Sequence, residues 1–92
     1  MPIREEYRFD ELKNIAEDFV IDELEKQLKE LPSDTELTEE LVLDMCAFAL
    51  NLAKPMYRAN LLGRMYATAY AEEHSAEIQK AVALAIKKIL SD

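Results

Sequence analysis

Residues 38–55 read TEELVLDMCAFALNLAKP, and this stretch predicts the central helix of the protein. From Leu41 to Ala53 only Asp44 and Asn51 are polar, and their i,i+7 spacing places both on the same helix face. A helix that is apolar on nearly every other side is normally surrounded by protein. In so short a chain, a partner subunit is an expected source of part of that cover.

The start of this helix has two candidate caps. Ser33 with Glu36 reads as a capping box, whereas Thr38 reads as a cap with Leu37 packing on Val42 as a hydrophobic staple. Thr38 is favoured. The helix is then expected over residues 39–54, ending before the proline at position 55.

Length and composition indicate a single all-α domain. The chain has 92 residues, of which 50% are hydrophobic and 33% charged, with one glycine and three prolines. These values are typical of a globular helical protein that is too short for two cores. We therefore expect one domain over residues 1–92, with residues 1–9 as an N-terminal extension, and a homodimer because the core is thin.

The flanking segments predict three more helices, for a compact four-helix domain. The first is expected from a cap at Asp10 to about Leu31, before Pro32. Its apolar residues recur at three- and four-residue steps: Leu12, Ile15, Ala16, Phe19, Val20, Leu24, Leu28 and Leu31. The last is expected over residues 73–90, with an inner stripe of Ile78, Val82, Ala85, Ile86 and Ile89. Residues 58–71 fit a helix face or an extended segment, and we interpret them as a turn followed by a short helix.

A basic, aromatic segment interrupts the acidic chain. The net charge is −8, and the first 44 residues carry fifteen acids against five bases, yet residues 45–71 contain no acid. This acid-free segment contains the bases Lys54, Arg58 and Arg64 and the tyrosines Tyr57, Tyr66 and Tyr70. Such a pattern favours an anionic ligand with flat rings, although a buried helix would also lack acids.

Asn51 has two interpretations within this segment. Its carboxamide lies among leucines, where it needs hydrogen-bond partners. In the structural interpretation it binds the carbonyls freed by the Pro55 break or fixes the turn from Pro55 to Tyr57; in the functional one it hydrogen-bonds a base edge or a phosphate of a ligand.

Other functional classes find little support. His74 is the only histidine and is expected in a solvated first turn; Cys46 is the only cysteine and is expected to be a buried, inert thiol. Together they cannot supply the ligands of a zinc site, and the serines lack a base to activate them. We expect no enzyme activity, no metal and no cofactor. The acidic balance disfavours duplex DNA, and the absence of an apolar span or signal peptide favours a cytoplasmic protein without membrane contact.

One signature resembles a known family. Asp44-Met45-Cys46-Ala47-Phe48-Ala49-Leu50-Asn51, followed by Pro55-Met56-Tyr57 and Gly63, is similar to the central motif of the ComFB family of late competence development proteins. The segment from Glu17 to Leu24 resembles the family's opening helix. The resemblance covers residues 10–90.

The resemblance implies a helical regulator without enzyme activity. Some cyanobacterial-type members of the family are cyclic di-GMP receptors, so the resemblance also implies a cyclic dinucleotide as the ligand. On that basis Arg58, Arg64 and Lys54 would meet phosphates, Tyr57 and Tyr66 would stack on guanine, and a protein partner, as yet unknown, would receive the signal.

This chain also departs from the family pattern. Leu52 stands where the family commonly has arginine, which favours a ligand-free dimerisation or adaptor domain as the alternative function. One branch of the family carries a cysteine-rich zinc site before the signature. This chain has residues 33–38 there, without cysteine.

Overall fold

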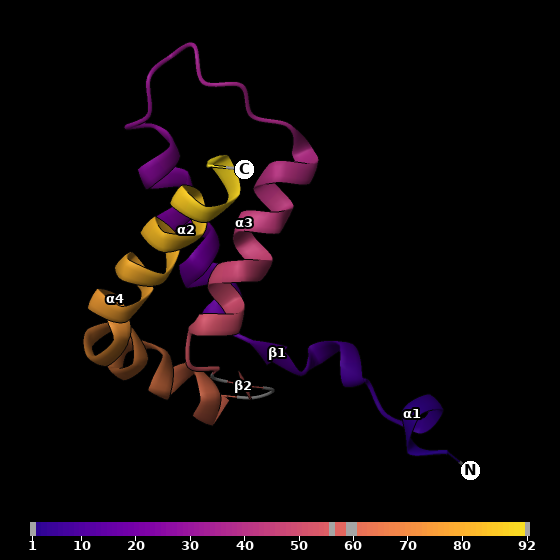
Figure 1. Cartoon of the computed structure of the whole chain (residues 1–92). Helices are drawn as coiled ribbons and strands as arrows, with labels where there is room; N and C mark the ends of the chain where they lie inside the picture. The colour runs from indigo at the N-terminus through magenta and orange to yellow at the C-terminus, as the bar shows by residue number, and fades with distance from the viewer. Residues whose placement is uncertain (1, 56, 59–60, 92) are drawn as a thin grey trace.

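Three long helices form the body of the protein (Figure 1). The computed structural model describes residues 2–55, 57–58 and 61–91, except for the side chains of residues 11, 58 and 61–68. The body consists of α2 (Ala16–Leu28), α3 (Glu39–Leu52) and α4 (Leu61–Leu90). The first turns of α4 run across the base in Figure 1, and the rest of the helix rises beside α2 and α3.

The core lies where these three helices meet. Its fully enclosed side chains come from each helix and include Val20, Met45, Tyr70 and Val82. The inner stripe expected of the last helix is confirmed, since Ile78, Val82, Ala85 and Ile86 are buried and Ile89 packs against them. The all-α class is therefore confirmed.

The α2 helix is shorter than expected at both ends. It begins at Ala16 instead of following a cap at Asp10, because the Asn14 side-chain oxygen accepts a hydrogen bond from the Ala16 amide at 3.2 Å. Asp10 instead lies in the short 3-10 helix η1 (Phe9–Glu11), and Leu12 is 47% exposed. At the other end α2 stops at Leu28, and i−3 hydrogen bonds form a tighter turn ahead of Pro32.

The expected cap of α3 is confirmed. The Thr38 hydroxyl oxygen accepts a hydrogen bond from the Leu41 amide at 3.2 Å. The helix ends at Leu52, and Ala53 is already extended, as befits a chain approaching Pro55. Asp44 and Asn51 are both exposed, in agreement with the prediction that they share a helix face. The exposure of Asn51 overturns the expectation that its carboxamide lies in apolar surroundings. However, Leu43 and Leu52 are also exposed, so the single chain does not cover α3 on every side.

The predicted division between residues 58–71 and 73–90 is wrong. Residues 61–71 and 73–90 belong to the single 30-residue helix α4, and Gly63 lies within it. Arg58 lies in β2. The described part of the chain has four α-helices, because a short helix, α1 (Ile3–Glu6), precedes the three helices of the body. The count agrees with the expectation only because α1 was not expected and α4 unites two helices that were expected to be separate.

A small antiparallel ladder was not expected. β1 (Lys13–Asn14) pairs with β2 (Tyr57–Arg58), with Lys13 opposite Arg58 and Asn14 opposite Tyr57. The ladder ties the start of α2 to the connection between α3 and α4. Before it, residues 2–12 form an N-terminal arm that extends away from the body (Figure 1). In the described part of the chain, no helix is long and apolar enough to cross a membrane.

Candidate ligand-binding site

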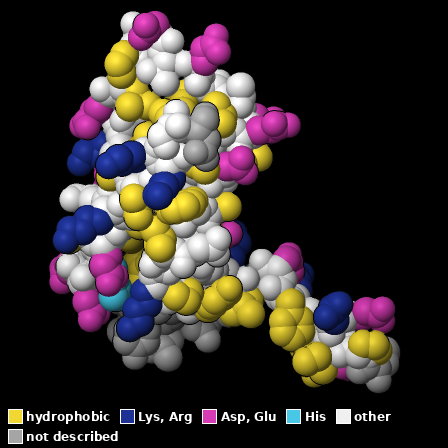
Figure 2. Space-filling view, viewed as in Figure 1, with side chains coloured by type: hydrophobic (Ala, Val, Ile, Leu, Met, Phe, Trp, Pro, Cys, Tyr) yellow, Lys and Arg dark blue, Asp and Glu magenta, His cyan; other side chains and the backbone are white. Residues whose placement is uncertain are grey.

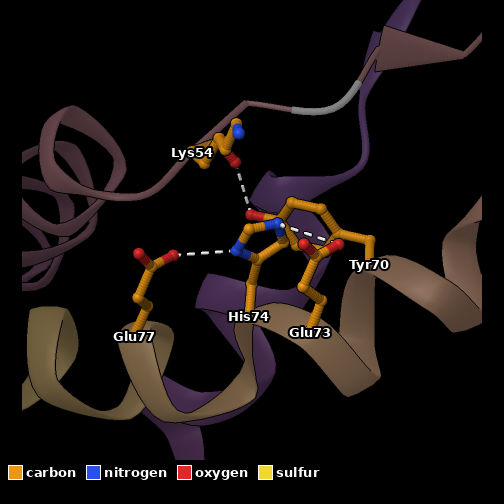
Figure 3. A network of polar contacts seen from close by, with 5 residues as sticks. All are labelled: Lys54, Tyr70, Glu73, His74 and Glu77. Carbon is orange, nitrogen blue, oxygen red and sulfur yellow. Dashed lines mark hydrogen bonds and ion pairs between the residues drawn. The ribbon is translucent and has the colours of Figure 1, made fainter.

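A buried tyrosine holds the connection between α3 and β2. Tyr70 of α4 is 1% exposed, and its hydroxyl donates a hydrogen bond to the backbone carbonyl of Lys54 at 2.5 Å (Figure 3). Its ring packs on Phe19 of α2 with the centroids 5.4 Å apart. Burial, followed by the charge of Glu77, raises the pKa of the Tyr70 hydroxyl, so it remains a protonated donor at neutral pH.

His74 extends this polar network along α4. Its ring centroid lies 4.7 Å from that of Tyr70, and Nδ1 lies 2.8 Å from a Glu77 carboxylate oxygen. Nε2 lies 3.7 Å from Glu73 on the other side (Figure 3). The side chain is only 12% exposed, so the expectation of a solvated first-turn histidine is wrong. Because α4 begins at Leu61, His74 does not lie in a first turn, and its ring is covered by the contact with Tyr70.

Three of the six predicted ligand residues are described with their side chains, and all three face solvent. Asn51 and Lys54 are exposed, and Tyr57 is 61% exposed. The Lys54 carbonyl, which lies beyond the last turn of α3, is bound by Tyr70 rather than by Asn51. The backbone of this connection is thus fixed from within while its polar and aromatic side chains remain outside.

The other three predicted residues are placed by their backbone alone. Arg58 lies in β2 opposite Lys13, while Arg64 and Tyr66 lie in the first turns of α4. The side chains of Arg58, Arg64 and Tyr66 lie outside the described residues. The acid-free segment therefore runs along α3, through β2, and into the start of α4, and the last two meet at the base of the molecule (Figure 1).

Sequence reasoning missed Tyr70 and His74 as the structural support of this region. Tyr66, Tyr70 and His74 recur every four residues, which is the spacing of one helix face. That signal would have been readable had residues 61–90 been treated as one helix. Lys13 was also missed, because nothing in the sequence indicates its pairing opposite Arg58.

Among the residues described, no three histidine, cysteine or acidic side chains are grouped so that they could hold a metal ion. The family model for late competence development protein ComFB matches residues 13–92. The chain belongs to the ComFB family. ComFB membership confirms the resemblance drawn from the motif in α3, and the match leaves the N-terminal arm outside the family segment. Among curated proteins, none matches this ComFB chain.

Proposed function

We propose that this ComFB-family chain is a cytoplasmic, homodimeric, non-enzymatic binding module that takes up a cyclic dinucleotide at the acid-free segment and signals to a protein partner. One observation supports the proposal: Lys54 and Tyr57, three positions apart in the sequence, are both exposed on a connection without acids, in a chain whose net charge is −8. A cyclic dinucleotide has two phosphates and two flat bases, so it can use both cations and tyrosines.

Each residue has a distinct part in this proposal. Arg58 and Arg64 bind the phosphates by paired hydrogen bonds, and Lys54 adds a third positive charge. Tyr57 and Tyr66 stack on the bases. Asn51 contacts a base edge or a phosphate from the end of α3. Tyr70 does not contact the ligand but holds the Lys54 backbone in place.

The test is calorimetric titration of the purified protein with a panel of cyclic dinucleotides. Each charge-assisted contact contributes on the order of 1.5–3 kcal/mol, so Arg58→Ala or Arg64→Ala should weaken binding roughly ten- to a hundredfold. Lys87→Ala is the matched control, because Lys87 is an exposed cation in the last turn of α4, outside the acid-free segment.

Salt separates the charged contacts from the stacking contacts. Affinity should fall as salt is added, and Tyr57→Ala should lower affinity with little change in that slope, since stacking releases no counterions. Absence of binding at hundred-micromolar ligand, roughly the level where affinities are already weak, would refute the proposal. If binding survives the loss of both Arg58 and Arg64, the protein does bind a cyclic dinucleotide, but the proposed binding residues are wrong.

A specific residue favours a second function, that of a ligand-free dimerisation or adaptor domain. Leu52, where the family commonly has arginine, is 53% exposed on α3. An exposed leucine near the end of this helix suits a protein contact better than a phosphate. In this alternative the calorimetric titration detects no binding of any cyclic dinucleotide, but the protein still associates with a partner. Leu52→Glu then weakens that association, whereas Lys54→Ala does not.

A further inference from the structure

Large apolar side chains gather in two exposed places. Of the ten that are exposed in the described part of the chain, seven belong to these two surfaces. The arm, residues 2–12, carries Ile3, Tyr7, Phe9 and Leu12. The second surface is a groove between α2 and α3, and Ile21, Leu37 and Leu43 line it. Figure 2 shows the arm as a separate projection rich in hydrophobic side chains.

The α2–α3 groove has an apolar floor and a charged edge. Its volume is about 570 Å³, and Leu24, Leu28, Val42 and Cys46 complete its lining. Glu25 and Lys29 lie at the edge and are both well exposed, and the Lys29 Nζ atom is 3.8 Å from the Glu25 Oε1 atom. A groove of this kind suits an apolar segment of polypeptide whose backbone polar groups remain at the solvent side.

The arm has no role in the core of its own chain. None of the residues of α1 is buried, and Tyr7 and Ile3 are 63% and 60% exposed. The arm also lies outside the segment that matches the ComFB family, which begins at residue 13. Its apolar side chains are thus explained neither by the core of the chain nor by the matched family segment.

The two surfaces do not meet within one chain. The arm leaves the body beside β1, at the start of α2, whereas the groove lies along the second half of α2 and reaches Leu37. In Figure 1 the arm points away from the body at the end opposite to the α2–α3 connection. A second copy of the chain, however, carries the same groove and the same arm.

The area available favours a reciprocal exchange. Enclosing a fully exposed Tyr or Phe side chain buries about 150–250 Å². Tyr7 and Phe9 are 63% and 45% exposed, so with Ile3 and Leu12 one arm brings roughly 300 Å² to the groove, and the contact removes on the order of 600 Å² from both surfaces together. That is below the size of a stable interface. Two such contacts related by a twofold axis remove on the order of 1,200 Å², which reaches the range of specific interfaces.

We propose that the N-terminal arm of one copy docks in the α2–α3 groove of a second copy, and that the second copy returns its own arm to form a closed dimer. Tyr7 and Phe9 are the anchors in the groove, and Leu43 and Ile21 form its walls.

The test is a complementation experiment with two full-length variants. The arm variant is Tyr7→Ser with Phe9→Ser, and the groove variant is Leu43→Glu; all three positions are exposed in the single chain, so the fold should survive. Each variant alone should self-associate more than about tenfold more weakly than the wild type in sedimentation equilibrium, since anchors of this kind carry most of the binding energy. Mixed together they should form a heterodimer of intermediate affinity, because one intact arm then meets one intact groove.

The matched control is Leu84→Glu, which changes another exposed leucine, 41% exposed, outside both surfaces. It should dimerise like the wild type. A mixture no tighter than the separate variants, or an arm variant that dimerises normally, would overturn the proposal. If Leu43→Glu disturbs the helical circular dichroism, Ile21→Glu replaces it on the opposite wall of the groove.

Cys46 provides an independent readout, because it is the only thiol in the chain and lines the groove. Its alkylation rate in the wild type should fall as protein concentration rises and second copies cover the groove. In the arm variant the rate should not depend on concentration. Protection in the wild type that is independent of concentration would mean that each arm folds back on its own chain, and it would reject the exchange.

Discussion

At the scale of single residues, Tyr70 links the core to the proposed ligand site. Its ring is enclosed by the core, while its hydroxyl reaches the Lys54 carbonyl at the point where α3 has ended. The same side chain packs against Phe19 and His74. A substitution of Tyr70 should therefore change both the free energy of unfolding and the position of the backbone that carries Lys54 and Tyr57.

Tyr70→Phe should lower the free energy of unfolding by about 0.5–1.5 kcal/mol, because the Lys54 carbonyl loses its donor while the ring packing is kept. Urea denaturation measures the change. Tyr57→Phe is the control, since Tyr57 is 61% exposed, and its removal of a hydroxyl should leave stability unaltered. Equal effects of the two substitutions would contradict the assigned role of the Tyr70 hydroxyl.

Cys46 should react slowly at neutral pH. Burial, and then the charge of Glu17, raises the pKa of its thiol, so at a given pH less of it is thiolate than in the unfolded chain. The pH profile of alkylation in the native protein should lie to the alkaline side of the profile measured in denaturant. A native profile that coincides with the unfolded one would show that neither burial nor Glu17 acts on the thiol.

At the scale of secondary structure, the two candidate caps of α3 can be separated by substitution. Thr38→Ala should destabilise the protein by about 1 kcal/mol, because the Leu41 amide loses its acceptor. Ser33→Ala should have little effect, since the alternative capping box is not the one used. Thermal unfolding of the two variants, compared with the wild type, measures both, and the reverse order of effects would reject the cap.

The continuity of α4 gives a second prediction. Glu72 is exposed in the middle of this helix, next to the position where the sequence pattern had suggested a break. Glu72→Pro should cost about 3 kcal/mol or more, because proline removes a hydrogen bond and clashes with the preceding turn. Glu72→Ala is the control and should be neutral or slightly stabilising. A proline tolerated at this position would indicate two separate helices.

The sequence predicted most of the helical body, but not the continuity of α4 or the β1–β2 ladder that connects the helices. The periodic stripes around Val20 and Val82 identified the buried faces of α2 and α4, because burial of one face imposes the helical period on the residues. A short helix was expected in the early part of α4, but its continuity with residues 73–90 was missed. Gly63 and the aromatic residues after it have low local helix propensity, which packing of Tyr70 in the core outweighs. The β1–β2 ladder was missed because two-residue strands are too short to show a period.

The candidate site was predictable only in part. Charge and aromatic content identified the acid-free segment, and Lys54 and Tyr57 are exposed as binding requires. The supporting residues Tyr70 and His74 could not be assigned, since their contacts depend on where α4 passes the end of α3 and on how its long helix is positioned.

At the scale of the whole molecule, the connection between α2 and α3 differs in sequence from the zinc-binding branch to which the family resemblance points. The connection between α2 and α3 contains Ser33 and Thr38 where that branch has cysteines. We expect the purified protein to contain no stoichiometric zinc, and a chelator to leave its melting temperature unchanged. Elemental analysis that finds one zinc per chain, or a lower melting temperature after chelation, would contradict this.

The β1–β2 ladder has a consequence for the order in which the chain folds. Pairing Lys13 with Arg58 closes a loop that contains all of α2 and α3. Closing a loop of roughly 40 residues costs about 3 kcal/mol by (3/2)RT ln n, before a constant is added. The ladder's few hydrogen bonds contribute only about 0.5–1.5 kcal/mol each, so it cannot form before the helices have packed. It is therefore a late step in folding and one of the first parts to open in the native state. In hydrogen exchange, its amides should lose protection well before those in the middle of α3.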